Sequence, residues 1–316
     1  MSRLKLTSTS VGHDVRVNAP TEERLSASIG IDRLPTLEIL TLLNAEDAAV
    51  ATAVAEVIPE LAVLVDAALA RIRLGGSVHY FGAGTSGRLA VLDAAELRPT
   101  YNVPPGLVVA HHAGGLPALV DAVENVEDDL GLGRLEADGL EATDIAIGLT
   151  ASGRTPFVAG ALERARELGA LTALITANPD AEIAHLADHL LAPATGPEAV
   201  TGSTRLKAGT AQKLVLNGFS TALMIRLGRT WSNLMVDVVA TNAKLRARLV
   251  RILREATGVD DAEARRALAE AGGELKPALL HLLSGVPADE ARTLLATHGG
   301  SVAAALGTLT TPTLPV

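Results

Sequence analysis

Five short apolar runs alternate with helical segments between residues 77 and 193, and this alternation constrains the fold more than any other feature. The runs are SVHYFG, GLVVAHHA, DIAIGLT, LTALIT and DHLLAP, which begin at Ser77, Gly106, Asp144, Leu171 and Asp188. Short apolar strands separated by helices are typical of a parallel sheet covered by helices on both faces. Aromatic residues make up only 2 % of the chain, so Ala, Val, Leu and Ile must build the core.

Further helices are expected on both sides of this region. We expect one from Thr36 through Leu43 and a second after Asn44, interrupted at Pro59. The apolar spacing of LPALVDAVENVEDDL predicts a helix over 116–130. Two long helices are expected over 203–228 and around NLMVDVVATNAKLRARLVRILREAT, residues 233–257. Three short amphipathic segments between about Gly258 and Gly307 predict a small C-terminal helical bundle.

Composition argues against several functional classes. The chain has no cysteine, which excludes disulfides, thiolate nucleophiles and Cys-ligated zinc. A net charge of −9 without a long basic run argues against nucleic-acid binding. His185 and His189 are four residues apart but have no third ligand in view, so no metal is expected. The N-terminus lacks the apolar core of a signal peptide, and no stretch reads as a membrane span. We therefore expect a cytoplasmic protein.

Two loops of similar sequence carry the chemistry of an anion site. GAGTSGR contains Gly84, Thr85 and Ser86 between a strand and a helix, and it fits neither the GxGxxG nor the Walker A pattern. Its small residues, hydroxyls and helix start suit a phosphate, although a tight turn with an ordinary Ser cap explains it equally well. TASGRTP, from Thr150 to Pro156, repeats the Ser-Gly-Arg core and adds Ser152, Arg154 and Thr155. Loops after parallel strands meet at one edge of the sheet, so the repetition favours a ligand site.

A third hydroxyl cluster, TGSTRLK, leads into a long helix. It contains Ser203, Arg205 and Lys207. Two cations beside a helix N-terminus oppose the helix dipole, so an anion there would make sense, and simple capping is the alternative.

The acidic candidates are Glu96, near a helix end, and Glu124 with Glu127 in an acidic run. Spacing alone does not choose among these carboxylates.

Longer segments resemble one known family. TEERLSASIGIDRLPTLEIL, YFGAGTSGRLAVLDAAE, GLTASGRTPFV and VTGSTRLKAGTAQKLVLN, with the later NLMVDVVATNAKL, are similar to the N-acetylmuramic acid 6-phosphate etherases. These are a branch of the sugar isomerase (SIS) domain proteins. The resemblance runs from about Thr21 through Gly307, in family order. It divides the chain into a flexible arm (1–20), a SIS domain with N-terminal helices (21–255), a small helical domain (256–307) and a flexible tail (308–316).

The resemblance implies a three-layer α/β/α sandwich and a homodimer with composite active sites. It implies elimination of D-lactate from a sugar phosphate, with net addition of water and no cofactor, in the recycling of cell-wall sugar. The glutamate of the family's LDA-x-E motif, its acid/base group, matches Glu96, and the second family glutamate matches Glu127. Gly84, Thr85, Ser86, Ser152, Arg154, Thr155 and Ser203 are then expected to bind the phosphate, with Lys207 as a charge partner.

Some positions depart from the family pattern. Ala95, Arg98 and the His111-His112 pair replace residues more common in the family, and Arg98 and His112 could change how Glu96 titrates.

Two other functions remain open. One alternative is a non-catalytic sugar-phosphate sensor, like the related glucokinase regulatory protein. The other is an aldose–ketose sugar-phosphate isomerase on the same fold. An assay of D-lactate release separates the three.

Overall fold

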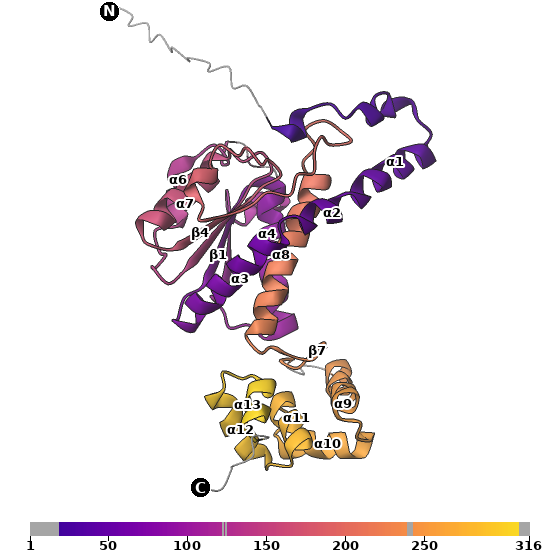
Figure 1. Ribbon diagram of the computed structural model, residues 1–316, viewed down its shortest axis with the longest axis vertical. Helices are drawn as coiled ribbons and strands as arrows, with labels where there is room; N and C mark the ends of the chain where they lie inside the picture. Colours follow the sequence, from indigo (N-terminus) through magenta and orange to yellow (C-terminus); the bar gives the residue numbers. More distant parts are fainter. Residues whose placement is uncertain (1–18, 122, 124, 239–242, 310–316) are drawn as a thin grey trace, which may run out of the picture.

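The computed structural model describes residues 19–121, 123, 125–238 and 243–309. Its centre is one parallel sheet in the order β2-β1-β3-β4-β5 (Figure 1). The strands are β1 (Val78–Gly82), β2 (Val108–His112), β3 (Ile145–Leu149), β4 (Leu171–Ile175) and β5 (His189–Leu191). All five lie within the apolar runs of the sequence, which confirms the predicted parallel sheet.

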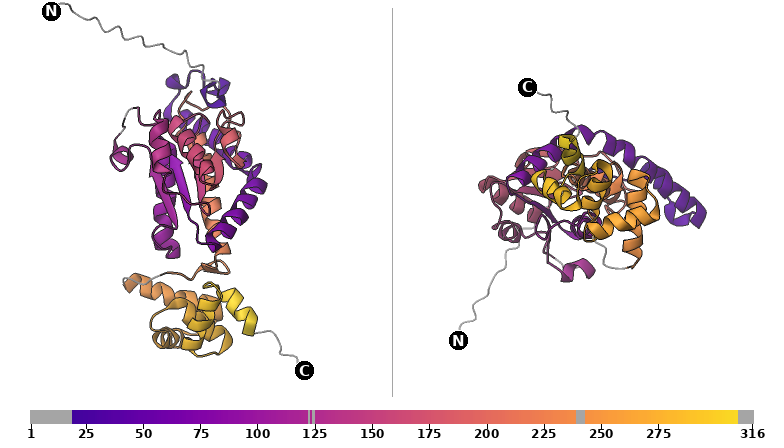
Figure 2. Two further views of the ribbon diagram at one scale, coloured as in Figure 1. Left: turned by 90° about the vertical axis from the view of Figure 1, so that its left-hand side faces the viewer. Right: turned by 90° about the horizontal axis from the view of Figure 1, so that it is seen from below.

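Alternate side chains of the strands enter two separate apolar layers. Tyr80 and Ile147 face α3 (Ile58–Arg73), α4 (Gly84–Tyr101) and α8 (Lys207–Arg226), whereas Phe81 and Ala146 face the other side. That second side is covered by α6 (Leu130–Glu136) and α7 (Pro156–Glu167). Figure 1 shows the sheet between these two groups of helices, and the left view of Figure 2 looks at the molecule from the side of α6 and α7. The predicted α/β/α sandwich is confirmed.

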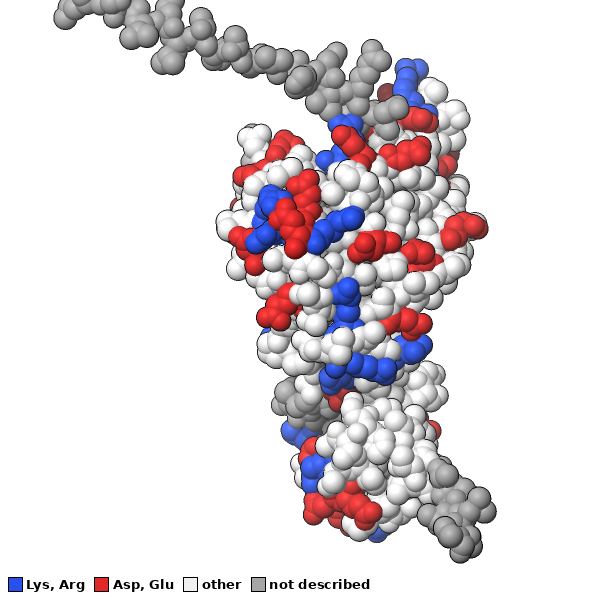
Figure 3. All heavy atoms as spheres, turned by 60° about the vertical axis from the view of Figure 1, so that its left-hand side comes forward, with Lys and Arg blue, Asp and Glu red and all other residues white. Residues whose placement is uncertain are grey.

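Close backbone contact holds α6 against α7. A Cβ on Gly133 would lie 1.9 Å from the Phe157 carbonyl oxygen, and one on Gly160 would lie 2.1 Å from that of Leu130. Glycine at both positions therefore permits this approach. The outer sides of the pair carry exposed ion pairs around Arg134 and Arg164. In Figure 3, acidic and basic side chains stand next to one another on the α/β part of the surface.

The N-terminal region forms a projecting arm. Three 3₁₀ turns, Pro20–Glu22, Ser26–Ser28 and Ile31–Arg33, lead into α1 (Thr36–Ala48) and α2 (Val50–Ala55). The expected helix break after Leu43 is wrong, because nothing at Asn44 blocks a helical hydrogen bond and α1 continues to Ala48. The interruption near Pro59 is confirmed, since Pro59 lies in the first turn of α3, where its missing N–H costs nothing. Figure 1 shows α1 standing away from the sheet.

No single helix of the described residues is long and apolar enough to cross a membrane. The stretches Thr36–Ala55 and Ile58–Arg73 reach that length and composition only as a pair, which is bent by 57°.

The helix expected over 116–130 is wrong for most of its length. Helix α5 covers only Pro117–Val120, Asp121 is extended, and Asn125 has a positive φ of 65°. The reason is a contact from outside the segment. The guanidinium of Arg88 donates to the carbonyl oxygens of Ala118 and Leu119, both at 2.8 Å, which would otherwise accept the next helical hydrogen bonds. Glu127 therefore lies in a turn, and Glu124 lies outside the described residues.

The predicted helix around 233–257 begins later than expected. Residues Thr230–Trp231 (β6) and Leu234–Met235 (β7) form an antiparallel hairpin, with Ser232 at a φ of 49° in its turn. Helix α9 covers Ala243–Thr257, and residues 239–242 of the predicted helix lie outside the described residues. The β-branched side chains of Val236 and Val238 are buried in the C-terminal core instead of lying on a helix.

The C-terminal core is larger than the sequence suggested. Four helices follow α9 in the described chain, not three: α10 (Asp261–Glu270), α11 (Leu275–Ser284), α12 (Ala288–Thr297) and α13 (Val302–Leu309). The glycine pairs and Pro287 separate four segments rather than three. Leu249 and Leu253 of α9 pack in the same apolar cluster, and the expected domain boundary at 255/256 falls inside that helix.

Candidate functional site

The first loop passes directly into a helix. α4 begins at Gly84, so Thr85 and Ser86 belong to its first turn, where backbone N–H groups have no partner within the helix. Gly87 is required by packing, because a Cβ there would lie 2.5 Å from the Gly82 carbonyl oxygen and 2.7 Å from the His112 ring. Free N–H groups, two hydroxyls and the positive end of the helix make this turn suitable for a phosphate.

The second loop lies beside the first. Gly82 at the end of β1 pairs with Leu149 at the end of β3, so both loops leave the sheet at one level. The Thr150 hydroxyl lies 2.7 Å from that of Thr155 and 3.4 Å from that of Ser152. Thr155 occupies the N-cap position of α7, but its hydroxyl bonds to Thr150 and not to the first N–H groups of the helix. A second helix start thus faces the same edge.

In the third hydroxyl cluster, TGSTRLK, a carboxyl group of the protein itself lies at the start of α8. The Glu198 carboxylate, fully buried, accepts the backbone N–H groups of Lys207 and Ala208, each at 3.0 Å. The Lys207 ammonium lies 2.6 Å from a carboxylate oxygen of Glu46 on α1. The predicted role of Lys207 was to pair with the phosphate. In the structure its ammonium group instead forms an ion pair with Glu46. Ser203 lies in the turn before α8, and its backbone N–H donates to Val200.

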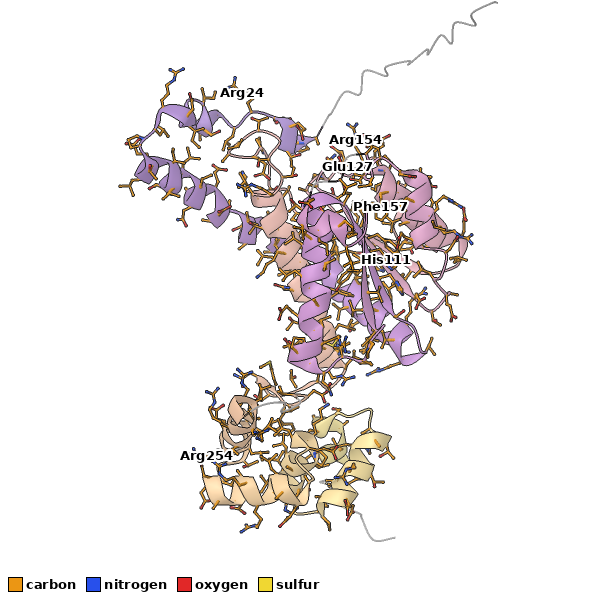
Figure 4. The ribbon with its side chains drawn as sticks, turned by 180° about the vertical axis from the view of Figure 1, so that it is seen from behind. Arg24, His111, Glu127, Arg154, Phe157 and Arg254 are labelled. Atoms are coloured by element: carbon orange, nitrogen blue, oxygen red, sulfur yellow. The ribbon has the colours of Figure 1, made fainter. Side chains whose placement is uncertain are left out.

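The two arginines of the repeated Ser-Gly-Arg core differ in their partners. Arg88 holds the carbonyl groups at the end of α5, as described above. Arg154 lies with its Nε 3.7 Å from Glu182. Figure 4 shows Arg154, Glu127 and Phe157 at the same end of the α/β domain. The backbone of Glu127 is fixed there, because its carbonyl oxygen accepts the N–H of Phe157 at 3.0 Å.

Glu96 is separated from this group. It lies on α4 twelve residues after Gly84, which at 1.5 Å per residue is about 18 Å along the helix. Its side chain is exposed. The structure thus brings together Gly84, Thr85, Ser86, Ser152, Arg154, Thr155 and Glu127, but not Glu96. His112 packs against Gly87 at the opposite end of α4 from Glu96.

The sequence analysis missed two buried polar residues, Gln212 next to Ser86 and Asp93 further along α4. The Ser86 hydroxyl donates to the Oε1 atom of Gln212 on α8 at 2.9 Å. Asp93 on α4 accepts hydrogen bonds from Tyr80, Asn217 and Ser220 at 2.7 to 3.0 Å. Burial raises the pKa of the Asp93 carboxyl, and these three donors lower it in part. Polar residues at buried positions of the mostly apolar helix α8 were the available signal.

Metal-binding clusters are not found in the part of the chain that the structure describes: no group of three His, Asp or Glu side chains could hold an ion. His189 is bonded through Nδ1 to Glu60 at 2.6 Å, and His185 to the Glu182 carbonyl.

Comparison with known proteins assigns this fold to a class. Residues 60–166 match the N-terminal SIS domain of glucokinase regulatory protein, and residues 125–222 match the SIS domain. A phosphoheptose isomerase from Francisella tularensis superposes with a TM-score of 0.50 at 18 % identity, covering 61 % of this chain and 100 % of that one. The α/β part is therefore a SIS domain.

Closer relatives define the family. The N-acetylmuramic acid 6-phosphate etherase of Thermobifida fusca (strain YX) is 59 % identical over 268 residues, 85 % of this chain and 88 % of that protein. The etherase of Serratia proteamaculans (strain 568) is 53 % identical over 269 residues, 84 % and 91 % of the two chains. The chain belongs to the N-acetylmuramic acid 6-phosphate etherase family, which confirms the resemblance predicted from its motifs.

Proposed function

We propose that this protein cleaves the lactyl ether of N-acetylmuramic acid 6-phosphate, as a carbon–oxygen lyase that needs no cofactor. The products are N-acetylglucosamine 6-phosphate and D-lactate, and the reaction consumes one water. We further propose that it acts in the cytoplasm, in the recycling of cell-wall amino sugar. The observation that carries the proposal is 59 % identity to a protein named for this activity over 85 % of the chain, with both candidate glutamates present.

The phosphate is held at the carboxyl edge of the sheet. The first turn of α4 offers the N–H groups and hydroxyls of Thr85 and Ser86, and the loop after β3 offers Ser152 and Thr155. Arg154 adds a positive charge at the same edge. Glu127 lies beside this phosphate site in the same chain, since its carbonyl is bonded to the start of α7. The sugar then extends from the phosphate over Glu127.

The chemistry needs two proton transfers on neighbouring carbons. The open-chain sugar has an aldehyde at C1, which acidifies the proton on C2. One carboxylate removes that proton, the C3–oxygen bond breaks, and lactate leaves with a proton from an acid. Water then adds to C3 of the alkene while C2 regains a proton. Glu96 is assigned the C2 proton, and Glu127 the second proton transfer or the orientation of substrate.

The position of Glu96 on α4 supports a site shared between two subunits. Six covalent bonds separate phosphorus from C2 of the sugar and span no more than about 8 Å, and a glutamate side chain adds roughly 5 Å. Together they fall short of the distance of about 18 Å along α4. Glu96 therefore serves the phosphate loops of a second copy, and each active site takes its phosphate loops and Glu127 from one subunit and its Glu96 from the other.

The surface around Glu96 supports a homodimer. Leu92, Ala95 and Pro99 are exposed on α4 at helical spacing around Glu96. Leu116 and Val120 of the α5 segment, which Arg88 of α4 contacts, are also 80 % and 87 % exposed. Exposed apolar side chains that flank a catalytic carboxylate mark a surface that a partner covers.

The first test is chemical. Incubation with N-acetylmuramic acid 6-phosphate should release D-lactate, and Glu96→Gln should bind the substrate without releasing it. Glu56→Gln, at an exposed position on the C-terminal side of α2, is the matched control and should turn over normally. Binding without lactate release by the unaltered protein would instead indicate a sensor, and ketose formation would indicate an isomerase.

A mixing experiment tests the shared site. Ser152→Asp places a carboxylate among the phosphate ligands and should abolish binding, so this variant and Glu96→Gln are each inactive alone. In mixed dimers, the loops of the Glu96→Gln subunit meet an intact Glu96, which should restore about one quarter of the wild-type activity in a random mixture. If mixing restores nothing while mixed dimers form, Glu96 does not act across subunits.

A further inference from the structure

The hydroxyl proton of Ser86 is donated to another side chain of the protein. Its hydroxyl donates to Oε1 of Gln212, 2.9 Å away, and the two residues are 8 % and 2 % exposed. A serine hydroxyl has one proton and two lone pairs. While that proton points to Gln212, the hydroxyl presents only lone pairs to the phosphate site, and lone pairs repel an anion.

The other end of the same amide is unsatisfied. The Nε2 atom of Gln212 is buried and has no hydrogen-bond partner among the described residues. A buried amide NH₂ without an acceptor costs free energy, and native proteins rarely leave one unused. Gln212 thus holds two unused protons beside a serine whose own proton is misdirected for ligand binding.

A half-turn of the amide reverses the direction of the hydrogen bond between Ser86 and Gln212. Rotation by about 180° about χ3 exchanges Oε1 and Nε2, and this terminal torsion is soft and two-fold. Nε2 then donates to the Ser86 oxygen, and the Ser86 proton becomes available to a phosphate oxygen. The exchange needs no backbone movement, because oxygen and nitrogen occupy nearly the same volume.

Packing places this amide where it can act on the first turn of α4. The Thr85 methyl group lies 3.5 Å from the Cβ position of Gly209. Gly209 and Gln212 are three residues apart, so they share one side of α8. This side of α8 therefore packs directly against the phosphate-binding turn.

We propose that Gln212 is a positioning residue that sets the direction of the Ser86 hydroxyl, and that phosphate binding turns its amide so that Ser86 donates to the ligand. This inference rests on the proposed function, because it assumes that Ser86 binds the phosphate of the sugar. Gln212 itself does not touch the substrate. It decides whether Ser86 presents a proton or lone pairs to the anion.

The test measures affinity separately from turnover. Calorimetry with inorganic phosphate gives the affinity, and lactate release gives kcat and KM. Ser86→Ala should weaken phosphate binding about tenfold or more, the usual value of a hydrogen bond to a charged group. Gln212→Met, which keeps the volume but has no amide, should weaken phosphate binding and raise KM by about three- to tenfold with little change in kcat. Lys213→Gln, at the next and exposed position of α8, is the control and should bind normally.

The double variant separates a positioning role from a general packing effect. If Gln212 acts through Ser86, Ser86→Ala/Gln212→Met should bind phosphate no more weakly than Ser86→Ala alone. Additive losses would overturn the inference. Gln212→Glu gives a second check: its carboxylate accepts the Ser86 proton and cannot donate, so phosphate binding as tight as wild type would also overturn it. If Ser86→Ala binds phosphate normally, the assumed phosphate site fails instead, whatever Gln212 does.

Discussion

The buried carboxylate of Glu198 accepts the backbone N–H of Lys207 at 3.0 Å and the adjacent N–H of Ala208 at the same distance. Glu198 thus caps α8 from nine residues upstream, with its carboxyl oxygens at the positive end of the helix. Glu198→Ala would leave both N–H groups buried and unpaired. We expect it to lower the free energy of unfolding by about 2 kcal/mol or more, measured by urea denaturation.

Another helix cap provides the comparison. Asp260 caps α10 at a single N–H, that of Glu263, at an exposed site. Asp260→Ala should cost about 1 kcal/mol. A loss for Glu198→Ala no larger than this would mean that the buried carboxylate contributes no more than an ordinary cap.

The sheet could be predicted because its signal is local. Each strand is an apolar run bounded by glycine, proline or charge, and the parallel arrangement follows from the intervening helices. The segment 116–130 could not be predicted in the same way, because Arg88, thirty residues upstream, takes the carbonyls on which a longer helix depends. The spacing of Leu116 and Val120 was helical, yet the described structure buries neither side chain.

The candidate site residues likewise divide into those that local sequence predicts and those that depend on distant contacts. Ser86 and Ser152 could be placed together from sequence, since loops after parallel strands meet at one edge. Lys207 could not be assigned, because its partner Glu46 is 161 residues away in the chain. By contrast, the distance of about 18 Å between Gly84 and Glu96 follows from their twelve-residue spacing on one helix. The contact of Lys207 with Glu46 is long-range, and local patterns do not encode it.

Asp93 joins three elements through neutral donors, and its charge is separable from its hydrogen bonds. Asp93→Ala would leave Tyr80, Asn217 and Ser220 without their acceptor, and we expect a loss of about 2 to 4 kcal/mol. Asp93→Asn keeps the shape, and Tyr80 can turn its hydroxyl to accept. It should therefore unfold at pH 7 at the same or a higher temperature than wild type, because it removes a buried charge.

The pH dependence of the Asp93 variant follows from the raised pKa of this carboxyl. In the unfolded chain Asp93 releases its proton near its ordinary pKa of 3.8, whereas in the folded protein it keeps the proton to a higher pH. The contribution of Asp93 to the free energy of unfolding therefore falls as the pH rises from 3.8 through the folded pKa. The advantage of Asp93→Asn over wild type should shrink as the pH is lowered toward 4. An advantage that grows on acidification would contradict this.

His79 should make the protein less stable in mild acid. Burial, with a smaller contribution from His111, lowers its pKa from 6.5 to about 4, and Asp144 opposes this shift. Between these two values the unfolded chain binds the proton and the folded chain does not, so stability is complete above about pH 6.5 and is lost as pH falls toward 4. Partial exposure reduces the effect to about 1 to 2 kcal/mol.

The matched variants isolate this effect. His79→Val should lose less stability than wild type between pH 7 and pH 5, measured by denaturant midpoints at each pH. His185→Gln, at an exposed position, should follow wild type. Equal pH slopes for His79→Val and wild type would assign the acid sensitivity to other groups.

Arg88 is expected to act on catalysis through Glu127 without touching the substrate. It holds the carbonyls of Ala118 and Leu119, and Ala118 packs beside Gly114, whose Cβ position lies 3.3 Å from the Val126 side chain next to Glu127. Arg88→Lys keeps the charge but cannot form this two-pronged contact. We expect kcat for lactate release to fall about tenfold with KM nearly unchanged, because Glu127 loses its fixed position.

The control and the double variant decide between this role and a direct one. Arg226→Lys, which alters an exposed ion pair with Asp66, should leave both constants unchanged. In a Glu127→Gln background, Arg88→Lys should cause little further loss, because the group that it positions is already inactive. A large rise in KM with kcat preserved would instead mean that Arg88 binds the phosphate, and the contact with α5 would then be a resting state that the substrate displaces.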